Sequence, residues 1–275
     1  MVTLFNPMVA RHADLSRLEF PLYCQPKYDG VRRLYYPGGD GWSRGLKLNY
    51  PAPVAHLTFP WPTGGVVLDG EILLPTHQYS FQQTISAYST INGTPLSRKL
   101  EYIVYDCYVL DRPKMMFYGR LNQAENIVNL DHVPYGVRMA DTYMVQNVDE
   151  LMAKYDEFVA EGYEGAMVRD RCGIYESGVR SHSLLKLKKF GEDEFKIVRV
   201  GEGIGKDAGH AMFWCKTADG EEFKVRPADT YEVRAEQFSR GNDLVGKMLT
   251  VRYTILTERG VPRDPRGKGL RDYED

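Results

Sequence analysis

The sequence predicts an α+β fold, in which a mixed α/β domain over residues 1–189 is followed by a small all-β domain over residues 190–275. Before residue 190, short apolar runs rich in β-branched residues alternate with helical patterns. After it, five short strand-like segments follow one another without a long helical pattern. These observations favour two domains of unequal size.

Six segments of the first region are typical of strands: 21–28, 31–37, 64–74, 102–110, 165–170 and 184–190. Most are apolar runs bounded by glycine or proline, whereas the last alternates apolar and basic residues. The segments 21–28 and 31–37 are separated only by Asp29 and Gly30, so we expect them to pair as a hairpin-like unit.

Two segments of the same region have helical spacing, 120–130 and 149–162. The second is the clearer, because acidic residues open it and Gly162 closes it. Its apolar face contains Leu151, Met152, Tyr155, Phe158 and Val159. The polar segment 80–93 has a weaker helical pattern and carries no motif.

The second region has strand-like segments at 195–203, 210–217, 221–227, 247–253 and about 254–258. Asp219-Gly220 lies between two of them and is a frequent hairpin turn. Short, evenly spaced strands joined by turns are typical of a small β-barrel. We therefore expect a barrel after residue 190.

The composition, with 43% apolar and 26% charged residues, is that of a globular protein. A net charge of −2 does not point to nucleic acid, but phosphate binding needs only a local basic groove. The four cysteines lack CxxC spacing, which makes a zinc site improbable and suits a reducing cytoplasm. No segment has the roughly 20 apolar residues of a membrane span.

Lys27 is the first residue of the run KYDGVR (27–32), which contains a glycine turn at Gly30 and ends in Arg32, with Arg33 directly after it. A free lysine has a pKa near about 10.4, and nearby cations or burial lower it toward a reactive amine. By itself, this run is explained equally well by an exposed turn and by a nucleophilic lysine.

Four further residues favour a functional site around Lys27. Glu71 lies within an apolar strand, where an unpaired carboxylate is costly, and Glu164 precedes another strand. Lys186 and Lys188 are two residues apart, which places them on one face of a strand. Each has an ordinary explanation, but together they describe a pocket with acids for a metal and lysines for a phosphate.

The ordered set of motifs resembles the covalent nucleotidyltransferases, most closely the small ATP-dependent DNA ligases of bacteriophage type. The matching runs are KYDGVR, SRG (43–45), LDGEI, YIVYDCYVLD, EGAMVRD, LLKLKKF and the tail RGVPRDPRGKGLRDYED. The resemblance covers nearly the whole chain. It implies a nucleotidyltransferase, or adenylation, domain over 1–189 and an OB-fold over 190–275.

The resemblance also implies a mechanism. Lys27 attacks the α-phosphate of ATP and carries AMP covalently, while Lys186 and Lys188 bind that phosphate and stabilise its developing charge. The AMP then passes to the 5′-phosphate of a nick in duplex DNA, and the neighbouring 3′-hydroxyl displaces it to seal the strand.

Other roles follow in the same way. Glu71 and Arg32 would contact the ribose and Tyr105 would stack on adenine. Glu164, assisted by Glu71, would bind Mg²⁺. Arg44 would meet the phosphate at the nick and bind DNA.

The tail is ambiguous. Arg263 is assigned to the pyrophosphate of ATP, with Arg266 and Arg271 as alternatives. Basic side chains of both domains are expected to line a DNA-binding face, namely Lys188, Lys189, Arg226 and Lys247. The segment 80–93 is expected to be either a DNA-facing surface or an ordinary surface excursion. The expected protein is a cytoplasmic monomer of a phage or bacterial host cell, without membrane contact.

Two other functions remain open from the sequence. An RNA ligase or an mRNA capping-type nucleotidyltransferase would use a similar lysine. A non-catalytic nucleic-acid-binding module would use the OB-fold alone, although the retention of Lys27, Glu71, Glu164, Lys186 and Lys188 argues against it.

Overall fold

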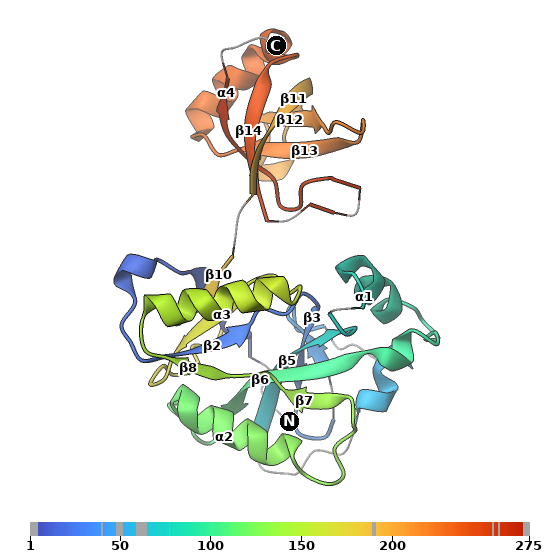
Figure 1. Ribbon diagram of the computed structural model, residues 1–275. Coiled ribbons are helices and arrows are strands. Elements are labelled where there is room, and N and C mark those ends of the chain that lie inside the picture. Colours follow the sequence, from blue (N-terminus) through green and yellow to red (C-terminus); the bar gives the residue numbers. More distant parts are fainter. Residues whose placement is uncertain are drawn as a thin grey trace. The chain divides into compact units, whose positions relative to one another are not determined.

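Figure 1 shows the computed structural model of the chain, which describes residues 5–39, 41–47, 52–58, 65–76, 78–188, 191–254, 256–257 and 259–271. The chain divides into two compact units, Met1–Lys188 and Lys189–Asp275. Unit 1 contains two five-stranded sheets with helices, and unit 2 contains a closed barrel. The predicted order, a mixed α/β region followed by a β-rich region, is therefore confirmed.

One sheet of unit 1 has the strand order β1-β10-β9-β2-β8. Its strands are β1 (Val9–His12), β2 (Leu22–Pro26), β8 (Tyr143–Val145), β9 (Ala166–Asp170) and β10 (Arg180–Leu187). Helix α3 (Val148–Ala160) covers this sheet through buried Leu151, Tyr155 and Phe158. Val159, expected on the same face, is 37% exposed because it lies at the margin of the apolar face. Gly162 follows the helix with a φ of 85°, as the predicted glycine stop requires.

The other sheet of unit 1 has the strand order β4-β3-β5-β6-β7. Its strands are β3 (Val31–Tyr35), β4 (Gly41–Ser43), β5 (Val66–Leu73), β6 (Glu101–Val109) and β7 (Val137–Met139). Helices α1 (Phe81–Tyr88) and α2 (Phe117–Val128) belong to the same half of the unit, and α2 packs on β6 and β7. The short 3-10 turns are η1 (Leu15–Arg17), η2 (Ala52–Leu57), η3 (Ser97–Lys99) and, in unit 2, η4 (Gly205–Asp207).

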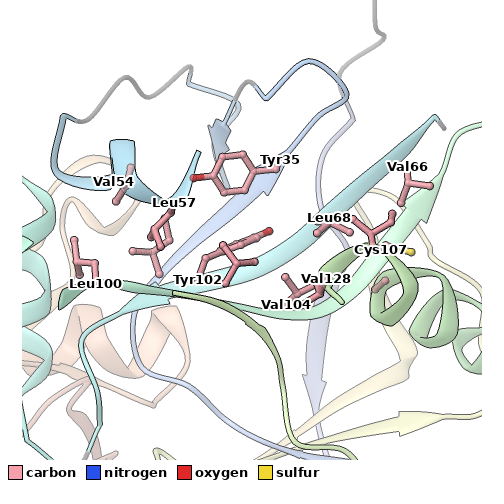
Figure 2. Packing of buried hydrophobic residues seen from close by; sticks show 14 of the residues in the cluster. Tyr35, Val54, Leu57, Val66, Leu68, Leu100, Tyr102, Val104, Cys107 and Val128 are labelled. Carbon is pink, nitrogen blue, oxygen red and sulfur yellow. The ribbon is translucent and has the colours of Figure 1, made fainter. Parts of the chain in front are cut away.

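The core of this second sheet fixes the position of β5, the strand that carries Glu71. Figure 2 shows Tyr35, Leu68, Tyr102 and Val104 packed together, with the rings of Tyr35 and Tyr102 4.8 Å apart. A Cβ on Gly70 would lie 2.4 Å from the carbonyl oxygen of Ile103 on β6. Glycine is therefore needed directly before Glu71, because only a residue without a side chain allows β5 and β6 to approach so closely.

The expected hairpin of segments 21–28 and 31–37 is wrong. Strands β2 and β3 form as predicted, but β2 pairs with β8 and β9, whereas β3 pairs with β4 and β5. The turn at 27–30 therefore carries the chain from one sheet to the other. Gly30 serves this crossing, since a Cβ there would lie 2.4 Å from the carbonyl oxygen of Ile72.

Unit 2 is a five-stranded closed barrel in the order β11-β12-β13-β15-β14. Its strands are β11 (Gly191–Glu202), β12 (Ala211–Lys216), β13 (Glu222–Pro227), β14 (Met248–Tyr253) and β15 (Arg266–Leu270). Alternate residues of these strands, such as Phe213, Cys215 and Val251, fill the interior. The predicted barrel is present.

Two predictions for unit 2 are wrong in detail. The fifth strand is β15, within the charged tail, and not the segment around 254–258, of which residues 255 and 258 lie outside the described part. Between Pro227 and Met248, helices α4 (Tyr231–Ser239) and α5 (Gly241–Leu244) also form. Helix α4 could not be predicted from an apolar face, because most of its residues are polar. Its one buried side chain is that of the charged Arg234.

A buried ion network joins the two sheets of unit 1. The carboxylate of Asp106 on β6 accepts hydrogen bonds from Nε of Arg120 on α2 and from Nη1 of Arg169 on β9, each at 2.8 Å. All three side chains are almost completely buried. Burial alone would raise the pKa of Asp106, but the two guanidinium groups outweigh it and hold this pKa below its usual range.

The substitution Asp106→Ala should destabilise unit 1 by about 3–5 kcal/mol, because it leaves two buried guanidinium groups without their carboxylate. Urea unfolding at pH 7, followed by tyrosine fluorescence, measures the change. Asp111→Ala is the matched control, since Asp111 is an exposed acid about 4.0 Å from Arg112 and should change stability by less than about 0.5 kcal/mol. Equal midpoints for both variants would contradict the role of the network.

Candidate active site

Lys27 lies at the seam between the two sheets of unit 1. It follows the last residue of β2, and its backbone is fixed at both ends: Lys27 N donates to Gly165 O at 2.8 Å, and Glu164 N donates to Lys27 O at 3.1 Å. These bonds extend the pairing of β2 with β9 by one step. The sequence separates Lys27 from Glu164 by more than a hundred residues, but the sheet brings them side by side.

Glu164 joins two of the predicted lysines. One carboxylate oxygen bonds Nζ of Lys27, and the other bonds Nζ of Lys188. All three side chains are largely buried, with 9–18% of their surface exposed. A shared carboxylate is the ordinary way to hold two ammonium groups close together, since it offsets their repulsion.

Gly165 makes this arrangement sterically possible. Its φ is +148°, and a Cβ at this position would lie 2.2 Å from the carbonyl oxygen of Leu187. Only glycine allows the start of β9 to approach the end of β10 so closely. Lys188, one residue after β10 ends, therefore comes within reach of Glu164.

A cavity of about 310 Å³ opens beside Lys27. Six of the predicted site residues line it: Lys27, Arg32, Arg44, Glu71, Tyr105 and Lys186. Lys186 faces this cavity from β10, while Lys188 bonds Glu164. The residues come from both sheets of unit 1, so the cavity exists because the chain crosses between the sheets at Lys27.

Glu71 is the acid within this cavity. It lies on β5 directly opposite Arg32 of β3, and the hydroxyl of Tyr105 donates to its carboxylate at 3.4 Å. Burial raises the pKa of Glu71 to about 7, although Lys27 and Arg32 lower it. The group can therefore gain or lose a proton near neutral pH, which is the behaviour of a functional carboxyl.

Arg32 is anchored by a residue that the motif analysis did not assign. Its Nε donates to Asp69 Oδ1 at 2.9 Å, its Nη2 pairs with the other oxygen, and its Nη1 donates to Met8 O at 2.7 Å. Tyr175 also donates to Asp69 at 2.6 Å. Burial disfavours the cation, but Asp69 and the two tyrosines Tyr105 and Tyr175 outweigh it and raise the pKa of Arg32 well above its usual range.

Arg33 does not have the predicted position. We expected it to act with Arg32 as a cation near Lys27, but successive side chains of a strand point to opposite faces. Arg33 lies over the ring of Tyr35, 4.7 Å from its centre, and is not among the residues that line the cavity. Lys188 does share a partner with Lys27, since the two lysines bond the two carboxylate oxygens of Glu164.

Tyr105 is held by two further cavity residues that sequence reasoning did not assign. Gln25 Nε2 donates to the carbonyl oxygen of Tyr105 at 3.2 Å, and Gln25 Oε1 accepts from Arg169 Nε at 2.8 Å. The guanidinium of Arg169 lies 5.6 Å from the centre of the Tyr105 ring. Arg169 ends the run EGAMVR, and a basic residue in an apolar strand is the signal that could have identified it.

Unit 2 contains the remaining predicted residues. Arg263 lies between β14 and β15, and its carbonyl oxygen accepts from Thr254 N at 3.0 Å. Arg271, one of its alternatives, pairs with Glu194 at 2.9 Å. Of the basic side chains expected to line a DNA-binding face, Arg226 pairs with Asp207, and Lys189 lies outside the described residues.

Among the residues that the structure describes, no group of three or more histidine, cysteine, aspartate or glutamate side chains has the geometry of a metal site. The helices of the described part are all too short or too polar to span a membrane. The three buried cysteines, Cys24, Cys107 and Cys215, are free thiols in the cores.

Comparison with known protein families shows to which family the chain belongs. Residues 4–188 match the ATP dependent DNA ligase domain, and residues 202–271 match the DNA ligase OB-like domain. This chain belongs to the ATP-dependent DNA ligase family. The predicted resemblance and the fold class, a nucleotidyltransferase domain followed by an OB-like domain, are confirmed.

Curated relatives include the DNA ligases of African swine fever virus. The chain is 33% identical to that of strain Badajoz 1971 Vero-adapted over 268 residues, covering 90% of this chain and 63% of the relative. It is 32% identical to that of isolate Pig/Kenya/KEN-50/1950, covering 98% of this chain and 69% of the relative. The chain thus spans about two thirds of the length of these viral ligases.

Solved ligase structures have the same fold. A structure from a study of DNA binding with a minimal scaffold in Lig E DNA ligases has a TM-score of 0.81 at 22% identity, and the match covers 98% of this chain and 100% of that chain. The bacteriophage T7 ATP-dependent ligase in complex with ATP has a TM-score of 0.56 at 18% identity, covering 97% and 98%.

The titration of Glu71 gives a testable pH dependence of the stability of unit 1. Because its pKa is raised to about 7, the stability contributed by its protonated form is fully present below the unfolded pKa of about 4.3 and is lost as pH rises through 7. Glu71→Gln should remove this dependence. Between pH 4.5 and 8, the wild type should lose on the order of 1–3 kcal/mol relative to the variant.

Urea unfolding at several pH values, without nucleotide or metal, measures this difference. Glu125→Gln, at an exposed position on α2, is the matched control and should follow the wild type at every pH. If the difference between wild type and Glu71→Gln does not vary with pH, Glu71 does not titrate in this window.

Proposed function

We propose that this chain is a DNA ligase that uses ATP to seal 5′-phosphate/3′-hydroxyl nicks in duplex DNA. The proposal rests chiefly on one observation: Lys27, in a chain of the ATP-dependent DNA ligase family, lies at a cavity with Arg32, Glu71, Tyr105 and Lys186. The reaction would proceed through AMP on Lys27 and then through a DNA-adenylate. Residues 1–189 would act as the adenylation domain and residues 190–275 as the OB-fold domain.

In the first step, Nζ of Lys27 attacks the α-phosphorus of ATP. A phosphorus–nitrogen bond forms, the bond to the bridging oxygen breaks with release of pyrophosphate, and the proton lost by the amine passes to solvent. When Glu164 is engaged elsewhere, Lys27 loses this carboxylate but keeps Lys186 and Lys188 nearby. Neighbouring cations favour the neutral, nucleophilic amine, and the same two lysines stabilise charge on the phosphate.

The nucleotide contacts follow from the walls of the cavity. Tyr105 offers a ring for adenine, held in place by Gln25 and Arg169. Glu71 and Arg32 face each other on adjacent strands and would bind the ribose, with Asp69 fixing the guanidinium plane.

The carboxylates of Glu164 and Glu71 suit Mg²⁺, which prefers oxygen ligands and commonly uses one or two carboxylates together with phosphates and water. Two acids beside a cavity lined with lysines fit this pattern. Bound there, the cation would neutralise phosphate charge during the transfer.

Later steps would use residues at the cavity mouth and in unit 2. Arg44 is exposed, lines the cavity and would bind the 5′-phosphate of the nick. Arg263 would bind pyrophosphate during AMP loading. A monomer would suffice for the contacts of unit 1, because one chain supplies every residue of the cavity.

Lys27→Ala should abolish AMP loading, because no other group replaces the attacking amine. Intact mass after incubation with ATP and Mg²⁺ should show one added AMP on the wild type and none on the variant. Lys154→Ala, at a lysine paired with Glu157 on α3, is the matched control and should load AMP as the wild type does. Full loading of Lys27→Ala would refute the assignment.

The same variant tests the order of steps. A nicked duplex that already carries AMP on its 5′-phosphate does not need a lysyl-AMP. Lys27→Ala should therefore seal this pre-adenylated substrate while failing on an ordinary nick with ATP. If the wild type seals neither substrate, the proposed function is wrong.

Arg44→Ala should load AMP but transfer it slowly to DNA, because its role is placed after the first step. We expect a roughly 10–100-fold loss in the single-turnover rate of DNA-adenylate formation, as for a removed phosphate contact. Arg112→Ala, an exposed arginine elsewhere in unit 1, should transfer AMP at the wild-type rate. A loss of AMP loading by Arg44→Ala that matches its loss of transfer would contradict this placement.

A further inference from the structure

A groove opens on unit 1 at the start of α2. It has a volume of about 600 Å³ and is lined by residues of the segment 112–119. The apolar side chains of Met116, Tyr118 and Ile174 are 41–44% exposed, and Ile174 forms a bridge with Met116. Single exposed apolar residues are ordinary, but these three adjoin one another. We call this surface, formed by the segments 112–119 and 171–174, the α2 groove.

The two segments of the α2 groove are fixed from beneath. Nη1 of Arg120, which belongs to the buried ion network, donates to Met115 O at 2.7 Å and to Gly173 O at 2.9 Å. Tyr118 N donates to Arg171 O at 3.2 Å, and the guanidinium of Arg171 lies 5.4 Å from the centre of the Tyr118 ring. The groove is therefore formed before any partner binds, which lowers the entropy lost on binding.

Gly119 leaves the α2 groove open. This residue lies within α2, where glycine is an unfavourable choice. A Cβ at this position would lie 3.2 Å from Cγ of Met115, so a larger side chain would occupy the groove. The space beside Met115 therefore exists because residue 119 has no side chain.

The rim of the α2 groove is basic. Its first segment carries Arg112 and Lys114 and its second carries Arg171, and all three are exposed. Two acids lie nearby: Asp111 is 4.0 Å from Arg112, and Asp170 accepts from a backbone N–H of the second segment at 2.8 Å. Within the described residues, neither Lys114 nor Arg171 has a carboxylate partner. The rim can therefore attract negative charge.

This combination of side chains is that of a protein interface. Methionine, tyrosine and arginine are enriched at contacts between proteins, and methionine adapts its shape to its partner. A phosphate backbone would use the cations of the rim but would leave the apolar side chains in water. A peptide segment with both apolar and acidic residues would use both.

A second copy of this chain fits the α2 groove poorly. In a two-fold dimer the same surface patch faces itself. The basic rims of the two copies would then be opposed, and like charges across an interface repel each other. The charge of the rim thus favours a different, acidic partner.

The α2 groove and the cavity beside Lys27 lie at opposite ends of β2. Lys27 follows the last residue of this strand, whereas Leu22, its first residue, pairs with Asp170, which directly precedes the second segment of the groove. At a rise of about 3.3 Å per residue, the path from Leu22 to Lys27 is about 16 Å long. A partner in the groove would therefore leave the cavity open.

We propose that the α2 groove is a docking site for a segment of a partner protein in which apolar side chains are followed by aspartate or glutamate. The apolar side chains fill the space beside Gly119 and cover Met116 and Tyr118. The carboxylates pair with Lys114 and Arg171. This site stands apart from the function proposed above, because it uses none of the residues placed in that reaction.

Peptide display on the full chain tests the proposal. A library of random peptides of about 12 residues is first depleted on immobilised Gly119→Leu and then selected on the wild type. The enriched peptides should combine apolar residues with aspartate or glutamate. Made synthetically, they should bind the wild type with a Kd of about 1–100 μM and bind Gly119→Leu at least about tenfold more weakly, as measured by fluorescence polarisation.

A charge reversal on the rim supplies a second, independent variant. Lys114→Glu should weaken binding of the same peptides about tenfold, because it replaces attraction with repulsion. Lys99→Glu, at an exposed lysine of η3, is the matched control and should bind them as the wild type does. No enrichment, enrichment of basic peptides, or equal binding by the wild type and both groove variants would overturn the inference.

Two further measurements detect the other occupants. If Lys114→Glu weakens binding to a nicked duplex about tenfold, the groove contacts DNA. If sedimentation velocity shows a dimer that Gly119→Leu abolishes, the groove holds a second copy. Either result overturns the inference. A wild type that seals no nick refutes the proposed function alone, since peptide binding is measured without ATP or DNA.

Discussion

The shared carboxylate of Glu164 is the interaction on which the site depends. One of its oxygens bonds Lys27, which lies at the crossing between the sheets, and the other bonds Lys188, which follows the end of β10. Without it, two ammonium groups at this distance would repel each other. The carboxylate itself is held by backbone: Glu164 N bonds Lys27 O, and Gly165 lets the chain pass Leu187 closely. Side-chain chemistry at this site is thus set by how closely three segments of backbone approach.

The same principle appears twice more around the cavity beside Lys27. Asp69 fixes Arg32, and Asp106 fixes Arg169, so these two arginines of the cavity wall each have a buried acid behind them. Each buried charge is paired, as the cost of desolvation requires. Tyr105 lies near both guanidinium groups. The wall of the cavity is consequently rigid before any ligand arrives, which reduces the ordering required on binding.

Much of this could be predicted from the sequence, because strand-forming runs and short motifs are local patterns. The strands around Lys27, Glu71, Glu164 and Lys186 all form. Pairing was less predictable: the run through Lys27 looks like a hairpin, but only long-range contacts with Gly165 show that it is a crossing.

The supporting acids were missed for a related reason. The sequence does not distinguish a buried aspartate from an exposed one. The partner of each acid is also distant along the chain: Arg32 lies 37 residues from Asp69, and Arg169 lies 63 residues from Asp106. Helix α4 was missed because its polar sequence hides Arg234, whose partners belong to other segments.

The position of β15 has a consequence for any shortening of the tail. This strand pairs with β13 on one side and β14 on the other, and so completes the barrel. Removing the charged segment would therefore do more than delete arginines from the surface. It would expose unpaired strand edges on both neighbours, and such edges recruit strands from other molecules. We therefore expect a chain shortened before β15 to self-associate.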